Sequence, residues 1–176
     1  MQLARKPTEE GLRMAELTNL ETKVAEVIGL AQAAQGATEK IEKLVEDEAL
    51  KHTLARMREE AKETEERTTS VVENFDGKKT AILEKARETK QEATEMMRTY
   101  LGSDADGLDG FEFLTMAEAG EVGHWEVLGT MNERAGNTEL RAVIQWATPI
   151  QQRHLEEARR GSLQLAADED PNEPAE

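Results

Sequence analysis

Apolar residues recur at every third or fourth position along most of this 176-residue chain, which is the spacing of one face of an α-helix. Leu17, Leu20 and Val24 begin one such stripe, and no segment shows the strict alternation typical of a half-buried β-strand. Helix-forming residues dominate the composition, whereas aromatic residues make up only 3% of it. The sequence therefore predicts an all-α protein.

Breaks in this pattern divide the chain into five predicted helices. They cover residues 8–35, 39–75, 78–101, 110–135 and 138–160. The first break is predicted at residues 36–38, and Gly136 followed by Asn137 supplies a helix stop and then an N-cap. Asp109, with Glu112 three residues later, has the spacing of a capping box for the fourth helix. Residues 1–160 are therefore expected to form one helical domain.

The last residues of the chain have a different composition. Residues 161–176 end in an acidic stretch that contains two of the four prolines, at Pro171 and Pro174. Such a segment buries too little apolar surface to offset the entropy of ordering it. We predict a disordered acidic tail from Gly161 onwards.

The net charge and the missing cysteines restrict the classes of function. A formal charge of −15 repels phosphate, so binding to nucleic acid or to an anionic membrane is not expected. No apolar stretch approaches the roughly 20 residues that a membrane span needs. The absence of cysteine fits a cytoplasmic protein and leaves only carboxylates and imidazoles as strong metal ligands. No phosphate-binding loop, nucleophile elbow or Ser-His-Asp set is visible, so no catalytic residue is assigned.

Polar side chains interrupt the apolar faces of two predicted helices. Glu121 projects into the stripe that contains Leu114 and Trp125, and His124 follows it by one turn. Glu-x-x-His is the spacing found in di-iron and di-manganese helical bundles. Gln151 and His154 repeat the spacing on the next predicted helix, with Gln in place of Glu.

Burial of an unpaired charge is costly, so a core-facing carboxylate should be paired, protonated or bound to a metal. Glu21 also lies on an apolar stripe, beside Leu17 and Val24. The pattern is compatible with a metal site, with a buried hydrogen-bonded network, and with a histidine pair at the surface or in an interface. The residues themselves leave these three interpretations open.

Three segments resemble the YciE-like branch of the ferritin-like superfamily, a group of stress-associated bacterial helical proteins. Residues 16–24 resemble its first-helix pattern, and residues 123–127 are similar to its Glu-His-Tyr-Glu-Ile segment. Residues 57–61 lie where its His-x-x-Glu-Thr is expected. The chain departs from this pattern where Met57 replaces a His, Gly123 replaces a Glu, and a Gln-Gln pair at 151–152 replaces Glu-Glu.

The resemblance implies a ferritin-like four-helix bundle with an additional helix and a stress-related role. It implies iron or manganese held in the bundle core by a set of carboxylates and imidazoles. The residues in question are Glu21, Glu60, Glu121, His124 and His154. The replaced ligands favour the alternative of a non-enzymatic stress or scaffold protein with a degenerate, metal-free site. We also expect a homodimer, because the third helix has a thin apolar stripe and Trp146 is predicted to be exposed.

Overall fold

A computed structural model describes residues 15–174 of the chain, and over that range the protein is helical with no β-strand. The prediction of an all-α protein is confirmed. The helices are α1 (Asn19–Glu42), α2 (Glu48–Val72), α3 (Lys79–Tyr100), α4 (Gly107–Ala135) and α5 (Thr138–Ala167). None of these helices contains a stretch that is both long and apolar enough to cross a lipid bilayer.

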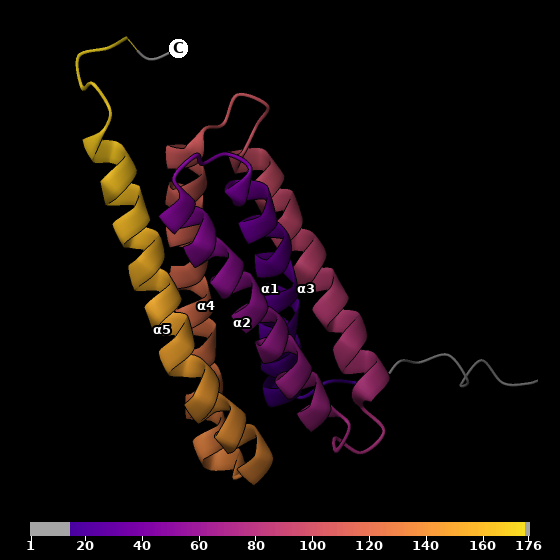
Figure 1. The fold of residues 1–176 in the computed structure, drawn as a ribbon. Coiled ribbons are helices and arrows are strands. Elements are labelled where there is room, and N and C mark those ends of the chain that lie inside the picture. Colours follow the sequence, from indigo (N-terminus) through magenta and orange to yellow (C-terminus); the bar gives the residue numbers. More distant parts are fainter. Residues whose placement is uncertain (1–14, 175–176) are drawn as a thin grey trace, which may run out of the picture.

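Each helix runs roughly antiparallel to the one before it, and α1 lies among three of the others (Figure 1). α1 packs extensively against α2 and α3, and also against α4. α5 packs along α4 and contacts α2, whereas α3 meets α4 only marginally. The third helix is therefore attached to the rest of the protein almost entirely through α1.

The first helix differs from its prediction at both ends. It begins at Asn19, because the Thr18 hydroxyl accepts a hydrogen bond from the Glu21 backbone N–H while the Glu21 carboxylate accepts one from the Thr18 N–H. The part of the prediction before residue 15 lies outside the described residues. The break predicted at residues 36–38 was wrong: Gly36 is exposed inside α1, which continues to Glu42 because buried Ile41 packs in the core.

The C-terminal end of α4 and the start of α5 agree with the prediction. Gly136 has a φ of 70°, in the left-handed region that favours glycine, and Asn137 caps α5 by accepting a bond from the Leu140 N–H. The capping box at the start of α4 was placed one turn too late. Asp106 is the N-cap, and Asp109 is the partner that closes the box three residues on.

The predicted boundary between bundle and tail was also wrong. α5 continues through Gly161 to Ala167, and Leu165 packs against buried residues of the core. A Cβ atom at Gly161 would lie 2.2 Å from the Phe111 ring, so glycine allows α5 to approach α4 closely at this point. Within the predicted tail, only residues 168–174 of the described range are both irregular and exposed.

The buried apolar residues form two clusters at opposite ends of the helices. The Trp125 cluster contains the first half of α1, the end of α2, the start of α3, and the adjoining parts of α4 and α5. The Phe111 cluster contains the other half of α1 with the start of α2 and of α4, Leu101, and Ala158 of α5. Between the two clusters, α4 contributes Glu118 and Glu121. The middle of the core is therefore polar.

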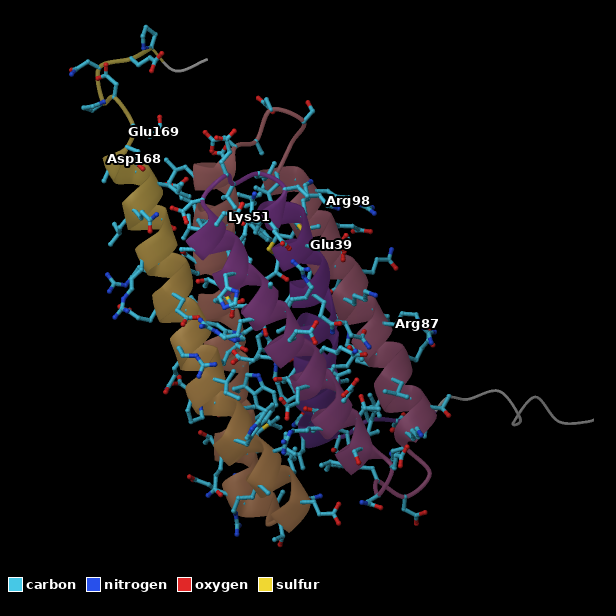
Figure 2. All side chains as sticks on the ribbon, viewed as in Figure 1. Glu39, Lys51, Arg87, Arg98, Asp168 and Glu169 are labelled. Carbon is cyan, nitrogen blue, oxygen red and sulfur yellow. The ribbon has the colours of Figure 1, made fainter. Side chains whose placement is uncertain are left out.

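The outer face of α3 and the helix ends carry much of the charge. Arg87 and Arg98 project from α3 away from the other helices, and Glu39 and Lys51 lie at the surfaces of α1 and α2 (Figure 2). Trp146, which was predicted to be exposed, is half-buried, and the Arg67 guanidinium lies 4.3 Å from the centre of its ring. This cation–π contact covers part of the surface on which the dimer prediction partly rested.

Candidate functional site: a polar layer in the core and an adjoining cavity

The buried stripe of α4 explains how two carboxylates reach the centre of the protein. Its positions alternate in steps of three and four residues, which keeps them on one side of the helix. The buried residues along it are Phe111, Leu114, Glu118, Glu121, Trp125 and Leu128. The apolar residues at each end anchor the stripe in the two clusters, so the helix cannot rotate the two central glutamates into solvent without losing that packing.

α5 supplies a matching polar pair. Its buried positions Ala147, Gln151, His154 and Ala158 follow the same steps, and the middle two are polar. We refer to Glu118, Glu121, Gln151 and His154 as the polar layer. All four side chains have at most 6% of their surface exposed. The sequence analysis correctly placed Glu121, Gln151 and His154 on core faces.

Glu118 is bonded within this layer. The Gln151 side-chain N–H donates a hydrogen bond to Glu118 Oε2, and His154 Nδ1 lies 3.7 Å from the same oxygen. Burial raises the pKa of Glu118 well above its ordinary value, and the neighbouring Glu121 carboxylate raises it further, while the Gln151 bond opposes both. The environment of Glu118 therefore favours its neutral, protonated form.

His154 connects the layer to an ion pair at its edge. His154 Nε2 lies 2.6 Å from Glu60 Oε2, and the Arg153 guanidinium donates to both oxygens of Glu60 at 2.5 Å. Burial pushes the pKa of Glu60 upward, but the hydrogen bonds from His154 and Arg153 outweigh it and the net pKa is lowered. Since ionised Glu60 can only accept, we assign the ring proton to Nε2.

The histidine itself is kept neutral. Burial lowers the pKa of His154, and the bond with Glu60 only partly offsets this effect. With its proton on Nε2, the neutral ring directs its unprotonated Nδ1 toward Glu118. The chain of contacts from the surface inward is Arg153, Glu60, His154, Glu118 and Gln151.

Glu121 has a different environment from Glu118, one turn away. No hydrogen bond joins its carboxyl to any group of residues 15–174, and burial raises its pKa to about 8. It lies on the wall of a cavity of about 200 Å³ between α1, α3 and α4. Small residues form much of this wall, namely Ala33, Ala34, Ala37, Ala93, Ala117 and Gly120.

The remaining predicted ligands lie elsewhere. Glu21 closes the capping box of α1, with Lys78 Nζ 3.7 Å from its carboxylate, next to the Trp125 cluster. His124 is about one-third exposed on the cavity side, where its Nδ1 lies 3.1 Å from Glu26 Oε2. The structure thus brings Glu60 and His154 together and leaves Glu121 one turn from their neighbour Glu118. Glu21 and His124 lie against other partners, Lys78 and Glu26.

Two residues of the site, Glu118 and Arg153, were not predicted from the sequence. Glu118 lies four residues after Leu114 and three before Glu121, so the three-and-four spacing alone could have revealed it. Arg153 gave no such signal, because it lies on the exposed side of α5 and reaches Glu60 only through the packing of α5 against α2.

The predicted metal set does not assemble in this arrangement. Within residues 15–174, no three His, Asp or Glu side chains converge closely enough to hold an ion. Comparison of the chain with protein-family models, with curated proteins and with solved structures finds no match. The candidate site is therefore interpreted from its own geometry, which is a layer of neutral and paired polar groups beside an apolar cavity.

Proposed function

We propose that this chain is a non-enzymatic helical-bundle protein whose core layer is a metal-free polar network, with a ferritin-like arrangement of helices and a stress-related role. The observation that carries the proposal is the guanidinium of Arg153 on both oxygens of Glu60. Glu60 is the candidate ligand that lies next to His154. A permanent cation therefore occupies the position where a metal would have to bind this carboxylate.

Arginine is an effective competitor at such a site. Its guanidinium stays charged throughout the accessible pH range, and a single terminal nitrogen, Nη2, donates to both oxygens of Glu60. A divalent ion bound by Glu60 and His154 would have to displace Arg153 or share the carboxylate with it at short range. Arg153 Nε also lies 3.9 Å from Glu157, so its position is set by two acidic partners.

The ferritin-like arrangement is supported by the pattern of helix contacts. α1, α2, α4 and α5 each pack against two others of this set, whereas α3 lies outside it on α1. α3 carries the chain from the end of α2 to the start of α4, so α2 and α4 run in the same direction (Figure 1). The stress-related role follows from the resemblance of residues 16–24 and 123–127 to the YciE-like proteins.

The second candidate is a bundle that binds iron or manganese, and one observation favours it. Glu118, Glu121 and His154 are buried in one layer and supply oxygen and nitrogen donors of the kind these metals take. Their pKa values are shifted toward the neutral forms, so a metal would have to displace protons from both carboxyls.

Thermal melts with and without excess Mn²⁺ or anaerobic Fe²⁺ distinguish the two candidates. A site occupied at a hundredfold excess over its Kd would stabilise the protein by about 2.7 kcal/mol. We expect no metal-dependent shift for the wild type. A rise in Tm that is lost in His154→Ala and retained in His52→Ala, which alters an exposed histidine of α2, would establish the metal-binding function instead.

We also propose a homodimer, formed through the second half of α3. Met96 and Tyr100 have more than half of their surface exposed, and Met116 of α4 is 41% exposed. Large apolar side chains grouped in this way favour contact with another protein surface. Light scattering at about 10 μM should give the mass of two chains, and a monomer would exclude any interface stronger than about −7 kcal/mol.

A further inference from the structure

The cavity between α1, α3 and α4 is separate from the ion pair that carries the proposed function. It lies on the α3 side of α4, whereas Arg153 and Glu60 lie on the α5 and α2 side. The cavity exists because small side chains on three helices meet where α3 does not approach α4. Alanine and glycine normally allow helices to pack closely, and here they leave space that no neighbour fills.

Most of the wall of this cavity is apolar. The larger apolar side chains that join the alanines in the lining are Leu30, Met96, Met97, Phe113, Leu114 and Met116, and Thr94 adds a hydroxyl. Glu118 and Glu121 reach the wall from α4, and no lysine or arginine contributes to it. His124 at the margin is already paired with Glu26. The cavity therefore combines an apolar volume with acidic groups and without a lysine or arginine on its lining.

Glu121 is the group that a ligand would contact. It is 94% buried, lines the cavity and has no hydrogen-bond partner within residues 15–174. The Glu121 oxygens are not fully enclosed by protein atoms, so a molecule in the cavity can reach them and replace the hydration that burial has reduced. An ammonium group placed beside it would supply the missing hydrogen bond and would displace to solvent the proton that Glu121 retains at neutral pH, and the chain's net charge of −15 favours the approach of a cation.

The volume restricts the size of such a ligand. A dry apolar cavity of about 150 Å³ is enough for benzene. At about 200 Å³, this cavity has room for a single ring and a short alkyl arm. We propose that it binds a small lipophilic amine, with the apolar part against the alanine and methionine side chains and the ammonium group on the carboxylate of Glu121.

Isothermal titration of the full chain with 2-phenylethylamine tests this proposal, with EDTA present so that no metal contributes. The neutral analogue 2-phenylethanol has nearly the same shape and no charge. We expect the amine to bind with 1:1 stoichiometry and more tightly than the alcohol. Glu121→Gln should weaken amine binding on the order of 10- to 100-fold, the range for a charge-assisted bond, and leave the alcohol unaffected.

A second variant tests the cavity independently of the carboxyl. Gly120 lines the cavity and a Cβ atom there meets nothing within 4 Å, so the side chain of Gly120→Leu begins in open space and should occupy the cavity and abolish binding of both compounds. Gly36→Leu is the matched control, because Gly36 also lies in a helix with open space around it but is absent from the cavity wall. It should bind as the wild type does.

Methionine methyl NMR locates the bound amine. The methyl signals of Met96, Met97 and Met116, which line the cavity, should shift on titration, while that of Met57 in the Phe111 cluster should not. Equal affinity of the wild type for amine and alcohol, or wild-type amine binding by Gly120→Leu, would overturn the proposal. Uptake of Mn²⁺ by the wild type would overturn the proposed function and leave this titration, performed in EDTA, unaffected.

Discussion

α4 is closely covered by α5 on one side and only partly covered by α3 on the other. α5 packs against it along the length of the helix, close enough that only glycine fits at position 161 beside Phe111. α3 packs closely on α1 and touches α4 only marginally. The two sides of one helix therefore differ in how fully they are covered.

The consequence is visible in Glu118 and Glu121, which share a helix, a residue type and nearly complete burial. Glu118 lies where α5 is close, and Gln151 bonds to it. Glu121 lines the cavity, as Glu118 does, but has no bonded partner among the described residues. The two glutamates, one turn apart on α4, thus differ in whether their carboxyls are hydrogen-bonded, because α5 provides a partner for only one of them.

The largest expected effect concerns the contact that fixes α3 to α1. A Cβ atom at Gly29 would lie 2.3 Å from the backbone oxygen of Ala86 and 2.8 Å from the Thr89 Cβ, so Gly29→Ala forces the two helices apart. We expect a loss of about 3 kcal/mol in the free energy of unfolding, measured by urea denaturation.

Gly36→Ala is the control for this change, because Gly36 lies in the same helix with nothing within 4 Å of its Cβ position. Removing backbone freedom from the unfolded chain should stabilise the protein by about 0.5 kcal/mol. If the two variants behave alike, α3 is not packed closely on α1, and the comparison of the two sides of α4 fails.

The next largest effect is the pH dependence of stability that results from the unpaired carboxyl of Glu121. The pKa of Glu121 is about 8 in the folded protein and close to 4.5 when unfolded, so the folded state retains a proton that the unfolded state releases. Stability should therefore fall as the pH rises through this interval. From pH 6.5 to pH 8 the loss from Glu121 alone is about 1.6 kcal/mol.

The same pH range distinguishes the effect of Glu121 on stability from that of His154. Because the pKa of His154 is lowered on folding, its contribution to stability is lost as the pH falls below about 6.5, its unfolded value, and is constant above it. Melting curves between pH 6.5 and 8.5 should show a falling Tm in the wild type. The fall should be smaller in Glu121→Gln, and an unchanged slope would show that Glu121 is not buried as described.

The smallest effect concerns the side of α4 that is well covered. Gln151→Leu removes the donor to Glu118 and leaves a second carboxyl without a partner, which should cost about 1.5 kcal/mol. Gln152→Leu, at the exposed neighbouring position, should change stability by less than about 0.5 kcal/mol. The loss should be reduced in the double variant with Glu118→Leu, because the orphaned carboxyl is then absent.

Local signals in the sequence were sufficient for much of the fold. The three-and-four spacing gave the all-α class and placed Glu121, Gln151 and His154 in the core. Gly136 and Asn137 gave the turn between α4 and α5, since their effect depends only on adjacent backbone. The break at Gly36 and the end at residue 160 were wrong because packing of Ile41 and Leu165 continues helices that local propensity would end.

The sequence by itself therefore determined which residues face the core, because the helical period alone fixes the face on which each side chain projects. The tertiary structure decided which partners those residues meet. Arg153 reaches Glu60 from another helix, and Glu121 borders a cavity because α3 lies away from α4. These outcomes depend on the distance between helices, which is set by the joint packing of side chains far apart in the chain.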